Sequence, residues 1–465
     1  MRIFFNGAAQ TVTGSQICIE ANGAKILLEC GLFQGKRADF YAFNQQFFFN
    51  PRKIDALLLS HAHIDHSGNI PNLVKQGFHG PIYATSPTCS LSDIMLQDSG
   101  HIQESDVEYV NKKRARRGQQ PLKPLYTVKD AQNASELFTP INYNDPFEVT
   151  PGITAQFFDA GHILGSSAIQ LTITERGKSV KLWFSGDIGR EKLPLLNDPV
   201  LPQGIDYMIM ECTYGDKLHR DPDLAFEEFR IVVKKTLVRG GKVIIPAFAV
   251  GRTQELVYFL NQMVSNGDIS SIPVYVDSPL AVNATDIFKQ YSYMFDSETK
   301  SFIDQGKHKA LAFPNLHYIR SVEESKKIND IYEPMIIISA SGMAETGRIL
   351  HHLRNNIENP KNTIMIVSWQ APNTLGRRLA EREKQVRIFG QLFDVNAEVS
   401  TIGGLSAHAG QDMLVKYAKE SRNTMKKLFL VHGEINAAKS LMEKLELNNI
   451  KSIGYPERSE MVEIY

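Results

Sequence analysis

The chain has 465 residues, of which 43% are hydrophobic and 22% charged, a composition typical of a folded, water-soluble protein. A chain of this length can form two or three domains whose cores need neither disulfides nor metal ions for stability. Lysine plus arginine and aspartate plus glutamate number 51 each, so the net charge is zero. This balance excludes binding to polyanions through bulk charge, although a local basic cleft stays possible.

The cysteines and the apolar segments indicate the compartment. The four cysteines (Cys18, Cys30, Cys89 and Cys212) are far apart in the sequence and form no C-x-x-C pair. They therefore predict neither a disulfide framework nor a cysteine-type zinc site, which favours a reducing environment. The start MRIFFNGAAQ lacks a basic segment followed by a long apolar run, and no window approaches 18 apolar residues. We expect a cytoplasmic protein that does not associate with a membrane.

Short apolar runs separated by Gly, Asn and Asp predict strands in the first part of the chain. The runs are MRIFFNG, SQICIEANGAKILLECG, DALLLSH, GPIYATS, GITAQFFDAGH, SAIQLTITERGKSVKLWFSGD and DYMIMECTY. Residues 21–25 and 175–178 are typical of hairpin turns, and helices are expected after His66, at 98–118 and at 129–138. Strands that lead into helices, with hairpins among them, indicate a layered α/β domain built on mixed sheets.

From residue 223 to residue 395, apolar strands alternate with amphipathic helices. This βαβ pattern predicts a parallel sheet covered by helices on both faces. We therefore expect one domain formed by residues 1–210 and 396–465, with a second domain, residues 211–395, inserted between its two parts. The basic run KKRARRG at 112–118 is more typical of a solvated helix face than of a binding site.

The segment HAHIDH concentrates side chains that can bind a metal. His61 and His63 are two positions apart and project to the same side of an extended loop. Asp65 and His66 lie at the start of the expected helix and can point into the same space. Zinc accepts such a set of imidazole and carboxylate ligands. With 13 histidines in the chain, three within six positions are not expected by chance, so the segment predicts a metal site.

Two further residues follow expected strands, His162 in FFDAGHILGSS and Asp187 in LWFSGDIGR. Each alone is more typical of a turn or of a polar residue with an ordinary structural partner. Together with HAHIDH and in this order, they resemble the metallo-β-lactamase superfamily. The resemblance implies an αββα sandwich with two zinc ions at one edge.

The resemblance also implies how the ligands are divided. The implied ligands are His61, His63 and His162 for one zinc ion, Asp65 and His66 for the other, and Asp187 between them. A carboxylate can bridge two ions about 3.5–4 Å apart because it has two oxygens. Water held between two zinc ions loses a proton near neutral pH, so we expect a hydroxide as the nucleophile.

At one position the sequence departs from the superfamily pattern. An aspartate usually ends the strand before the first motif, whereas LLECGLFQG carries Glu29. The resemblance implies that this acid orients a metal ligand and does not bind the metal itself. The additional methylene predicts altered ligand geometry or altered occupancy of the second metal site.

Five further segments narrow the function. They are MECTYGDKLHRD (210–221), PAFAVGRTQEL (246–256), ISASGMAETGRILHHL (338–353), LSAHAGQD (405–412) and LVHGE (430–434). In this order they resemble the β-CASP family, the nucleic-acid-cleaving branch that includes RNase J and the endonuclease subunit of the pre-mRNA 3′-end cleavage factor. The likeness covers essentially the whole chain and is greatest to bacterial and archaeal RNA-processing members. The implied fold class is α/β, a metallo-β-lactamase sandwich with an inserted β-CASP domain.

The family pattern implies roles for residues in these segments. It makes His432 a ligand of the second zinc ion, His408 the general acid and Glu211 the partner of His408, while Asp65 is both ligand and catalytic residue. An alkoxide leaving group gains from a proton donor whose pKa is near the ambient pH. Arg252, Ser341, Gly342 and Arg348 are candidate phosphate contacts. For the two arginines, helix-start packing or ion pairing is an equal alternative.

The sequence thus predicts a two-zinc ribonuclease with its site in a cleft between the domains. A hydroxide bound by both ions would attack single-stranded RNA, and His408 would protonate the leaving 3′-oxygen. Endonuclease action, additional 5′ exonuclease action and a homodimer all stay open. Two other functions remain as alternatives: a small-molecule hydrolase of the same fold, such as a thioesterase or lactonase, and a catalytically weak RNA-binding scaffold.

Overall fold

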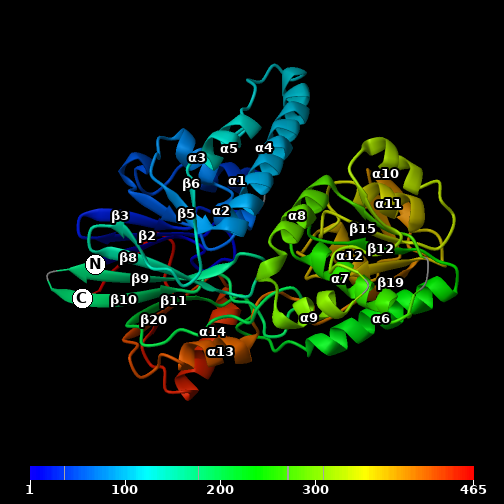
Figure 1. The fold of residues 1–465 in the computed structure, drawn as a ribbon. Helices are drawn as coiled ribbons and strands as arrows, with labels where there is room; N and C mark the ends of the chain where they lie inside the picture. The colour runs from blue at the N-terminus through cyan, green and yellow to red at the C-terminus, as the bar shows by residue number, and fades with distance from the viewer. Residues whose placement is uncertain (36, 176, 270–271, 307, 465) are drawn as a thin grey trace. The chain divides into compact units, whose positions relative to one another are not determined.

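The computed structural model describes residues 1–35, 37–175, 177–269, 272–306 and 308–464 (Figure 1). The chain divides into two compact units. Unit 1 comprises Met1–Glu191, Asp198–Leu218 and the chain from Ala407 onward, and unit 2 comprises Lys192–Asn197 and His219–Ser406. Within the described ranges, none of the helices combines the length and the hydropathy that crossing a bilayer requires.

Unit 1 contains two seven-stranded sheets. The first has the order β22-β1-β2-β3-β4-β5-β6, with β22 (Glu460–Glu463), β1 (Arg2–Gly7), β2 (Gln16–Ala21), β3 (Ala24–Leu28), β4 (Ala56–Leu58), β5 (Ile82–Thr85) and β6 (Phe138–Ile141). The second has the order β21-β20-β11-β10-β9-β8-β7, with β21 (Ile453–Gly454), β20 (Lys427–Val431), β11 (Tyr207–Glu211), β10 (Lys178–Phe184), β9 (Ser167–Glu175), β8 (Ile153–Asp159) and β7 (Phe147–Thr150). Both sheets contain parallel and antiparallel pairs, as predicted.

The two sheets of unit 1 pack face to face between layers of helices (Figure 1). Apolar side chains of both sheets form one buried cluster, in which the rings of Phe5 and Phe429 lie 5.3 Å apart. The outer face of the first sheet is covered by α3 (Ile70–Lys75), α4 (Ser86–Ala115) and α5 (Val128–Ser135), and that of the second by α13 (Gln411–Lys419) and α14 (Ile435–Leu447). The predicted αββα sandwich is confirmed, and its doubly covered sheets explain why β11 is buried along its whole length.

In unit 1, local sequence features explain the hairpin turns and the start of one helix, which differs from the predicted start. Asn22 and Gly23 have φ values of 51° and 80°, the left-handed pair that a tight two-residue hairpin requires. At 175–178, Glu175 pairs with Lys178, and residue 176 lies outside the described part of the chain. The helix expected at 98–118 begins earlier, at Ser86, because the Thr85 side chain caps its first turn. The run 112–118 at its end is largely exposed, as predicted.

Unit 2 is built on a six-stranded sheet in which all pairs are parallel, as predicted. Its order is β14 (Leu316–Ile319), β13 (Val274–Asp277), β15 (Ile336–Ser339), β12 (Val243–Pro246), β16 (Thr363–Ile366) and β19 (Glu398–Thr401). Around it lie α6 (Pro222–Val238), α7 (Arg252–Ser265), α8 (Pro279–Gln290), α9 (Ser297–Gln305), α10 (Val322–Ile328), α11 (Ile349–Asn356) and α12 (Leu375–Ala380) (Figure 1). A hairpin of β17 (Gln385–Ile388) and β18 (Gln391–Asp394) completes the unit.

The units divide the chain at different residues from the predicted domain bounds of 210/211 and 395/396. Strand β19, expected in the last domain, lies parallel to β16, with Glu398 opposite Thr363. The short segment 192–197 also belongs to unit 2, where Leu195 N donates to Thr299 Oγ1 at 3.2 Å. Because β19 has only one apolar residue, Val399, its sequence does not indicate a sheet, and its pairing with β16 assigns it to unit 2.

Candidate metal centre

The predicted ligands of unit 1 gather at one edge of the sandwich. The ligands follow the ends of β4 (His61 and His63), β8 (His162), β10 (Asp187) and β20 (His432), and Glu211, the predicted partner of His408, ends β11. Because β10, β11 and β20 are parallel, their carboxyl ends meet at the same edge. Asp65 and His66 lie in the short helix α2 (Ile64–Ser67), which follows β4. His408 is brought in by a backbone bridge to Gly189.

Four of these side chains form a first group of donor atoms, with His63 at its centre. Nδ1 of His63 lies 3.1 Å from Nε2 of His61 and 3.2 Å from Nε2 of His162. Oδ2 of Asp187 lies 3.5 Å from each of the two Nε2 atoms. A tetrahedral zinc ion with bonds of about 2.0–2.1 Å places neighbouring donors roughly 3.3 Å apart. The spacing of the group therefore fits one zinc-sized ion.

A second group lies beside the first. Nε2 of His66 lies 3.3 Å from Nε2 of His432, and Oδ2 of Asp65 lies 3.4 Å from the same His432 atom. Oδ1 of Asp187 lies 3.3 Å from Nε2 of His66, whereas Oδ2 of Asp187 faces the first group. The two oxygens of one carboxylate thus face two different donor groups, which is the arrangement that a bridge between two ions requires.

The chemistry of the donors also fits a metal. Asp187 is 2% exposed, and within the described part of the chain its Oδ1 has no hydrogen-bond partner. Burial lowers the pKa of His61 and His162 well below the usual value, and that of His63 to about 4, so these imidazoles are neutral. Neutral imidazoles around a buried carboxylate with an unpaired oxygen offer lone pairs to a cation. We conclude that the site holds a metal cofactor.

Glu29 fixes the orientation of one histidine in each group. Its carboxylate is fully buried and accepts hydrogen bonds from Nδ1 of His66 at 2.6 Å and from the backbone N of Ser60 at 2.6 Å. The Ser60 hydroxyl donates to the same carboxylate at 2.9 Å and lies 2.9 Å from Nδ1 of His61. Both histidines therefore carry a proton on Nδ1, and their Nε2 atoms face the two donor groups.

A hydroxyl performs the same task for His432. Oγ1 of Thr213 lies 3.0 Å from Nδ1 of His432 and donates to the His432 carbonyl at 3.0 Å. Because the hydroxyl proton is given to the carbonyl, Nδ1 of His432 must be the donor and Nε2 faces Asp65. Neither Ser60 nor Thr213 was predicted from the sequence. Their only signal is proximity to motif residues, Ser60 directly before His61 and Thr213 two positions after Glu211.

Glu29→Gln is expected to weaken zinc binding by about 10- to 100-fold, the usual effect of losing a partner that orients a ligand. The amide cannot accept from both His66 and Ser60, so the metal held by the group of His66 should be lost first. Competition with a chromogenic chelator measures both affinities. Glu20→Gln, which removes a surface partner of Arg2 and Lys25, is the matched control and should keep both metals. Unchanged affinities in Glu29→Gln would contradict the orienting role.

His408 and Glu211 form a pair next to Asp187. Nδ1 of His408 lies 3.1 and 3.2 Å from the two carboxylate oxygens of Glu211, which is fully buried and also accepts from Ile188 N at 2.7 Å. Burial alone would lower the pKa of His408, but Glu211 and Asp187 raise it to about 9. Since Nδ1 binds Glu211, the proton available for transfer is the one on Nε2. Asp187, Glu211 and His408 also lie close enough to form a further possible metal group, as do Glu29, His61 and His66.

The candidate phosphate contacts belong to unit 2, and both arginines have protein partners there. Arg348 donates to Asp277 Oδ1 at 2.7 Å and to the Arg320 carbonyl at 2.7 Å. Arg252 is 9% exposed and pairs with Glu255, although its Nε has no hydrogen-bond partner among the described residues. The ion-pairing alternative therefore describes both side chains in this structure, and substrate contact by either stays a prediction.

Ser341 and Gly342 lie in a turn and not at the start of a helix. The next helix, α11, begins at Ile349, with Arg348 at its N-cap. The Ser341 hydroxyl accepts from Glu345 N at 3.2 Å and Thr346 N at 3.4 Å, so these backbone donors are already used within the turn. Substrate contact by Ser341 and Gly342 likewise stays a prediction.

An αββα sandwich with paired His and Asp donor groups at one edge defines a metallohydrolase of the metallo-β-lactamase type. Three family models match the chain: a metallo-beta-lactamase superfamily domain at residues 18–182, a Beta-Casp domain at 253–379 and a Zn-dependent metallo-hydrolase RNA specificity domain at 393–454. The chain is 35% identical to ribonuclease TTHA0252 of Thermus thermophilus over 93% of both chains. The chain belongs to the β-CASP family of this superfamily.

Other relatives agree with this placement. The chain is 30% identical to an RNase J-like protein of Methanocaldococcus jannaschii over 92% of both chains. It is 31% identical to the transcription termination factor FttA of the same organism, over 93% of this chain and 67% of that protein. A solved structure of a protein of unknown function from Enterococcus faecalis has a similar fold, with a TM-score of 0.55, 14% identity and 99% coverage of both chains.

Proposed function

We propose that the chain is a metal-dependent ribonuclease that hydrolyses phosphodiester bonds of single-stranded RNA. The observation that carries this proposal is the position of the His408–Glu211 pair beside Asp187, whose two oxygens face the two donor groups. The ribonuclease among the relatives and the RNA specificity model at residues 393–454 support RNA as the substrate.

Two zinc ions are the proposed cofactor. His61, His63 and His162 would hold one ion, Asp65, His66 and His432 the other, and Asp187 both. Bound there, the ions supply a nucleophile at neutral pH and neutralise charge on the scissile phosphate. The chain's own residues hold the donors in register, because Glu29 and Thr213 fix the tautomers of His66 and His432.

His408 is the proposed general acid. Its Nε2 proton would pass to the leaving 3′-oxygen, while Glu211 holds Nδ1 and keeps the imidazole protonated. The products would be a 3′-hydroxyl and a 5′-phosphate. Arg252, Ser341, Gly342 and Arg348 remain candidate contacts for phosphates of the substrate. The proposal includes the cytoplasm as the compartment and leaves a homodimer open.

The two alternative functions are less well supported. A thioesterase or lactonase would share the donor groups, but a thiolate leaves without a proton, and neither substrate accounts for the match to an RNA specificity domain at residues 393–454. A catalytically weak scaffold is disfavoured because all seven proposed ligands lie at metal-binding distances from one another in two groups.

Cleavage of end-labelled single-stranded RNA, combined with elemental analysis of bound metal, tests the proposal. We expect zinc in the purified protein, cleavage products with 3′-hydroxyl and 5′-phosphate ends, and loss of cleavage on chelation with recovery on adding zinc. A duplex of the same sequence is the control and should resist cleavage. Hydrolysis of thioesters or lactones with the RNA left intact would establish the small-molecule alternative instead.

A further inference from the structure

The C-terminal end of α4 in unit 1 carries a group of cations that the metal centre does not use. Residues 109–129 contain neither aspartate nor glutamate, and the lysines and arginines of this stretch are concentrated at its centre. The cations of the group, called the α4 tip below, are Lys112, Lys113, Arg114, Arg116, Arg117 and Lys123. Because the net charge of the whole chain is zero, the α4 tip is a local concentration of positive charge.

The α4 tip is open to solvent. Figure 1 shows the second half of α4 extending beyond the sheets and the shorter helices of unit 1. Val107 is the last buried residue of the helix, and residues 112, 113 and 115–123 are all exposed. A ligand as large as a nucleic acid strand can therefore reach the cations.

The chain that follows α4 turns back and is fixed against the helix. Oδ1 of Asn111 accepts from the backbone N of Leu122 at 2.8 Å, and its Nδ2 donates to the Leu122 carbonyl at 3.0 Å. Nε of Arg114 donates to the carbonyl of Gln120 at 2.7 Å. These hydrogen bonds hold the segment of Lys123 beside the last turns of the helix, so the cations form one preformed surface.

Most cations of the α4 tip have no counter-ion in the protein. Lys112 pairs with Glu108, and Nζ of Lys113 lies 4.3 Å from the ring centroid of Tyr109. Among the described residues, the other four cations take part in no ion pair. A helix C-terminus attracts cations, but its dipole is equivalent to only about half an elementary charge. The dipole therefore accounts for a small part of this charge.

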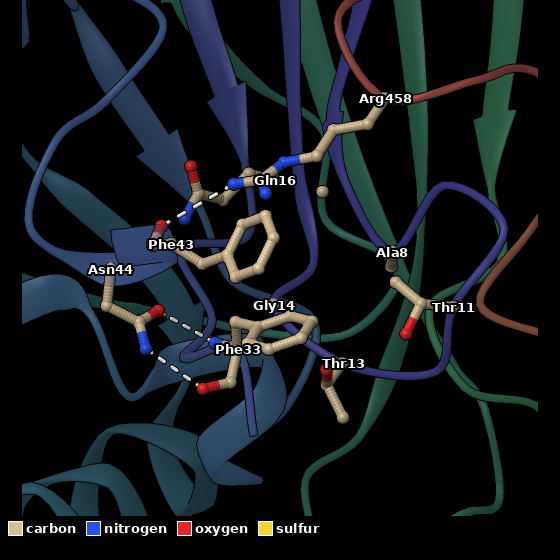
Figure 2. Close-up of a pocket in the computed structure, with 10 residues that line it drawn as sticks. Ala8, Thr11, Thr13, Gly14, Gln16, Phe33, Phe43, Asn44 and Arg458 are labelled. Carbon is tan, nitrogen blue, oxygen red and sulfur yellow. Dashed lines mark hydrogen bonds between the residues drawn. The ribbon is translucent and has the colours of Figure 1, made fainter. Parts of the chain in front are cut away.

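An arginine elsewhere in unit 1 shows how the protein itself can bind such a cation. Arg458 lies in a pocket beside the loop that joins β1 to β2 (Figure 2). Its guanidinium lies 4.3 Å from the ring centroid of Phe43 and donates to the carbonyls of Asn6 at 3.2 Å and Phe43 at 3.5 Å. The side chains of Arg116 and Arg117 make no such contact with a described residue, so they are available to an external anion.

The opposite end of α4 contacts the metal centre. Oγ1 of Thr85, which caps the first turn of the helix, donates to the carbonyl of Gly165 at 2.6 Å, and Oγ1 of Thr88 donates to the same carbonyl at 2.8 Å. Gly165 lies in the loop of His162, whose backbone N donates to Oγ of Ser166 at 3.0 Å. With 30 residues at a rise of 1.5 Å each, α4 extends about 45 Å from this loop to the α4 tip.

We propose that the α4 tip binds the phosphate backbone of the RNA substrate at a distance from the metal centre. The inference rests on the proposed function. Exposed lysines and arginines bind single-stranded nucleic acids with little regard to sequence, through their charge and the release of counterions. An RNA that occupies both places must span the length of α4, about 13 nucleotides of a stacked strand at roughly 3.4 Å per nucleotide. Long RNAs should therefore gain an affinity that short RNAs lack.

Substrate length tests this surface. The tip variant Arg116→Gln/Arg117→Gln/Lys123→Gln removes three charges whose side chains make no hydrogen bond or ion pair with a described residue. On an RNA of about 30 nucleotides it should raise KM by about ten- to hundredfold at roughly 0.1 M salt, with kcat little changed. On an RNA of about four nucleotides, which cannot reach from the metal centre to the α4 tip, KM should equal that of wild type. A merely structural role of the α4 tip would change both substrates alike.

Binding is measured separately, by fluorescence anisotropy of the longer RNA in the His408→Ala background, where the RNA stays uncut. The slope of log K against log salt should be smaller by about 2 in the tip variant, roughly 0.7 for each charge removed. The control Lys439→Gln/Lys444→Gln/Lys451→Gln removes three exposed lysines on and after α14, which covers the other sheet. It should keep the wild-type KM and slope.

The outcomes separate the two proposals. If wild type cuts RNA but the tip variant keeps the wild-type KM on long RNA and the wild-type slope, the surface is wrong and the ribonuclease proposal stands. If wild type cuts no RNA but the tip variant loses affinity for long RNA, the proposed function is wrong and the binding surface stands. If the tip variant binds RNA as wild type does but no longer binds phosphatidylserine vesicles, the α4 tip takes anionic lipid and the proposal is overturned.

Discussion

Asp187→Asn is expected to leave the protein with one weakly bound metal ion or none, and without detectable RNA cleavage. The two oxygens of Asp187 lie 3.5 Å and 3.3 Å from histidine nitrogens of the two different donor groups. Its amide counterpart carries no charge and offers one oxygen, so it cannot bridge two ions that repel each other at about 3.5–4 Å. The loss of metal affinity should exceed the roughly 10- to 100-fold effect of removing an outer partner.

Elemental analysis and RNA cleavage, measured on the same preparation, test this expectation. Asp206→Asn is the control. Asp206 is a carboxylate of unit 1 that accepts from the backbone N of Lys181 at 2.9 Å, and it lies outside the donor groups. It should retain both metals and full activity. A purified Asp187→Asn protein with the wild-type metal content would disprove the bridging assignment.

His408→Ala is expected to lower kcat by about 10²- to 10⁴-fold, the range for loss of a general acid, while metal content stays that of wild type. Retention of metal matters because His408 also lies in another possible donor group, with Asp187 and Glu211. If metal is lost together with activity, His408 is a ligand and not a proton donor. His79→Ala, which changes an exposed histidine of unit 1, is the control.

The leaving group distinguishes proton donation from substrate binding. A p-nitrophenyl phosphodiester releases an anion that needs no proton, whereas the 3′-oxygen of RNA does. His408→Ala should therefore lose far more activity on RNA than on the p-nitrophenyl substrate. Equal losses on both substrates would show that His408 acts through binding or positioning.

Glu211→Gln should change the pH profile in a defined direction. Burial lowers the pKa of His408, and Glu211 is the first of the groups that raise it, to about 9. A general acid works in its protonated form, so activity falls as pH rises through this pKa. Without the charge of Glu211 the pKa falls, and the descending limb of kcat/KM should move to lower pH. A limb that does not move would remove Glu211 from the positioning role.

Much of the fold could be read from the order of residues because it depends on local periodicity. Near-continuous apolar strands between amphipathic helices predicted the parallel sheet of unit 2, and the alternating strands of unit 1 predicted mixed sheets. Strand β19 shows the limit of such patterns. It has a single apolar residue, Val399, which does not indicate a sheet, and pairing with β16 decided its unit.

The candidate site, too, was predicted from the sequence in part, and the rest is visible only in the structure. The types and spacing of His61, His63 and Asp65 indicated metal chemistry, since few segments place so many ligands so close together. Contacts between distant residues had no such signal in the sequence. Examples are the hydrogen bonds that link His61 through Ser60 to Glu29 and the hydrogen bond between Thr213 and His432. The ion pair of Arg348 with Asp277 is another. Glu29 illustrates this difference. A glutamate in place of the usual aspartate suggested altered ligand geometry, whereas the structure shows that its carboxylate accepts from both Ser60 N and His66 Nδ1.

The sequence by itself therefore determined which kinds of atoms the centre contains and on which elements they lie. Only the tertiary structure decided that one carboxylate faces both donor groups and which nitrogen of each histidine faces them. The physical reason is that periodicity and turn residues act over a few positions, whereas hydrogen bonds and cavities depend on side chains brought together from strands hundreds of residues apart.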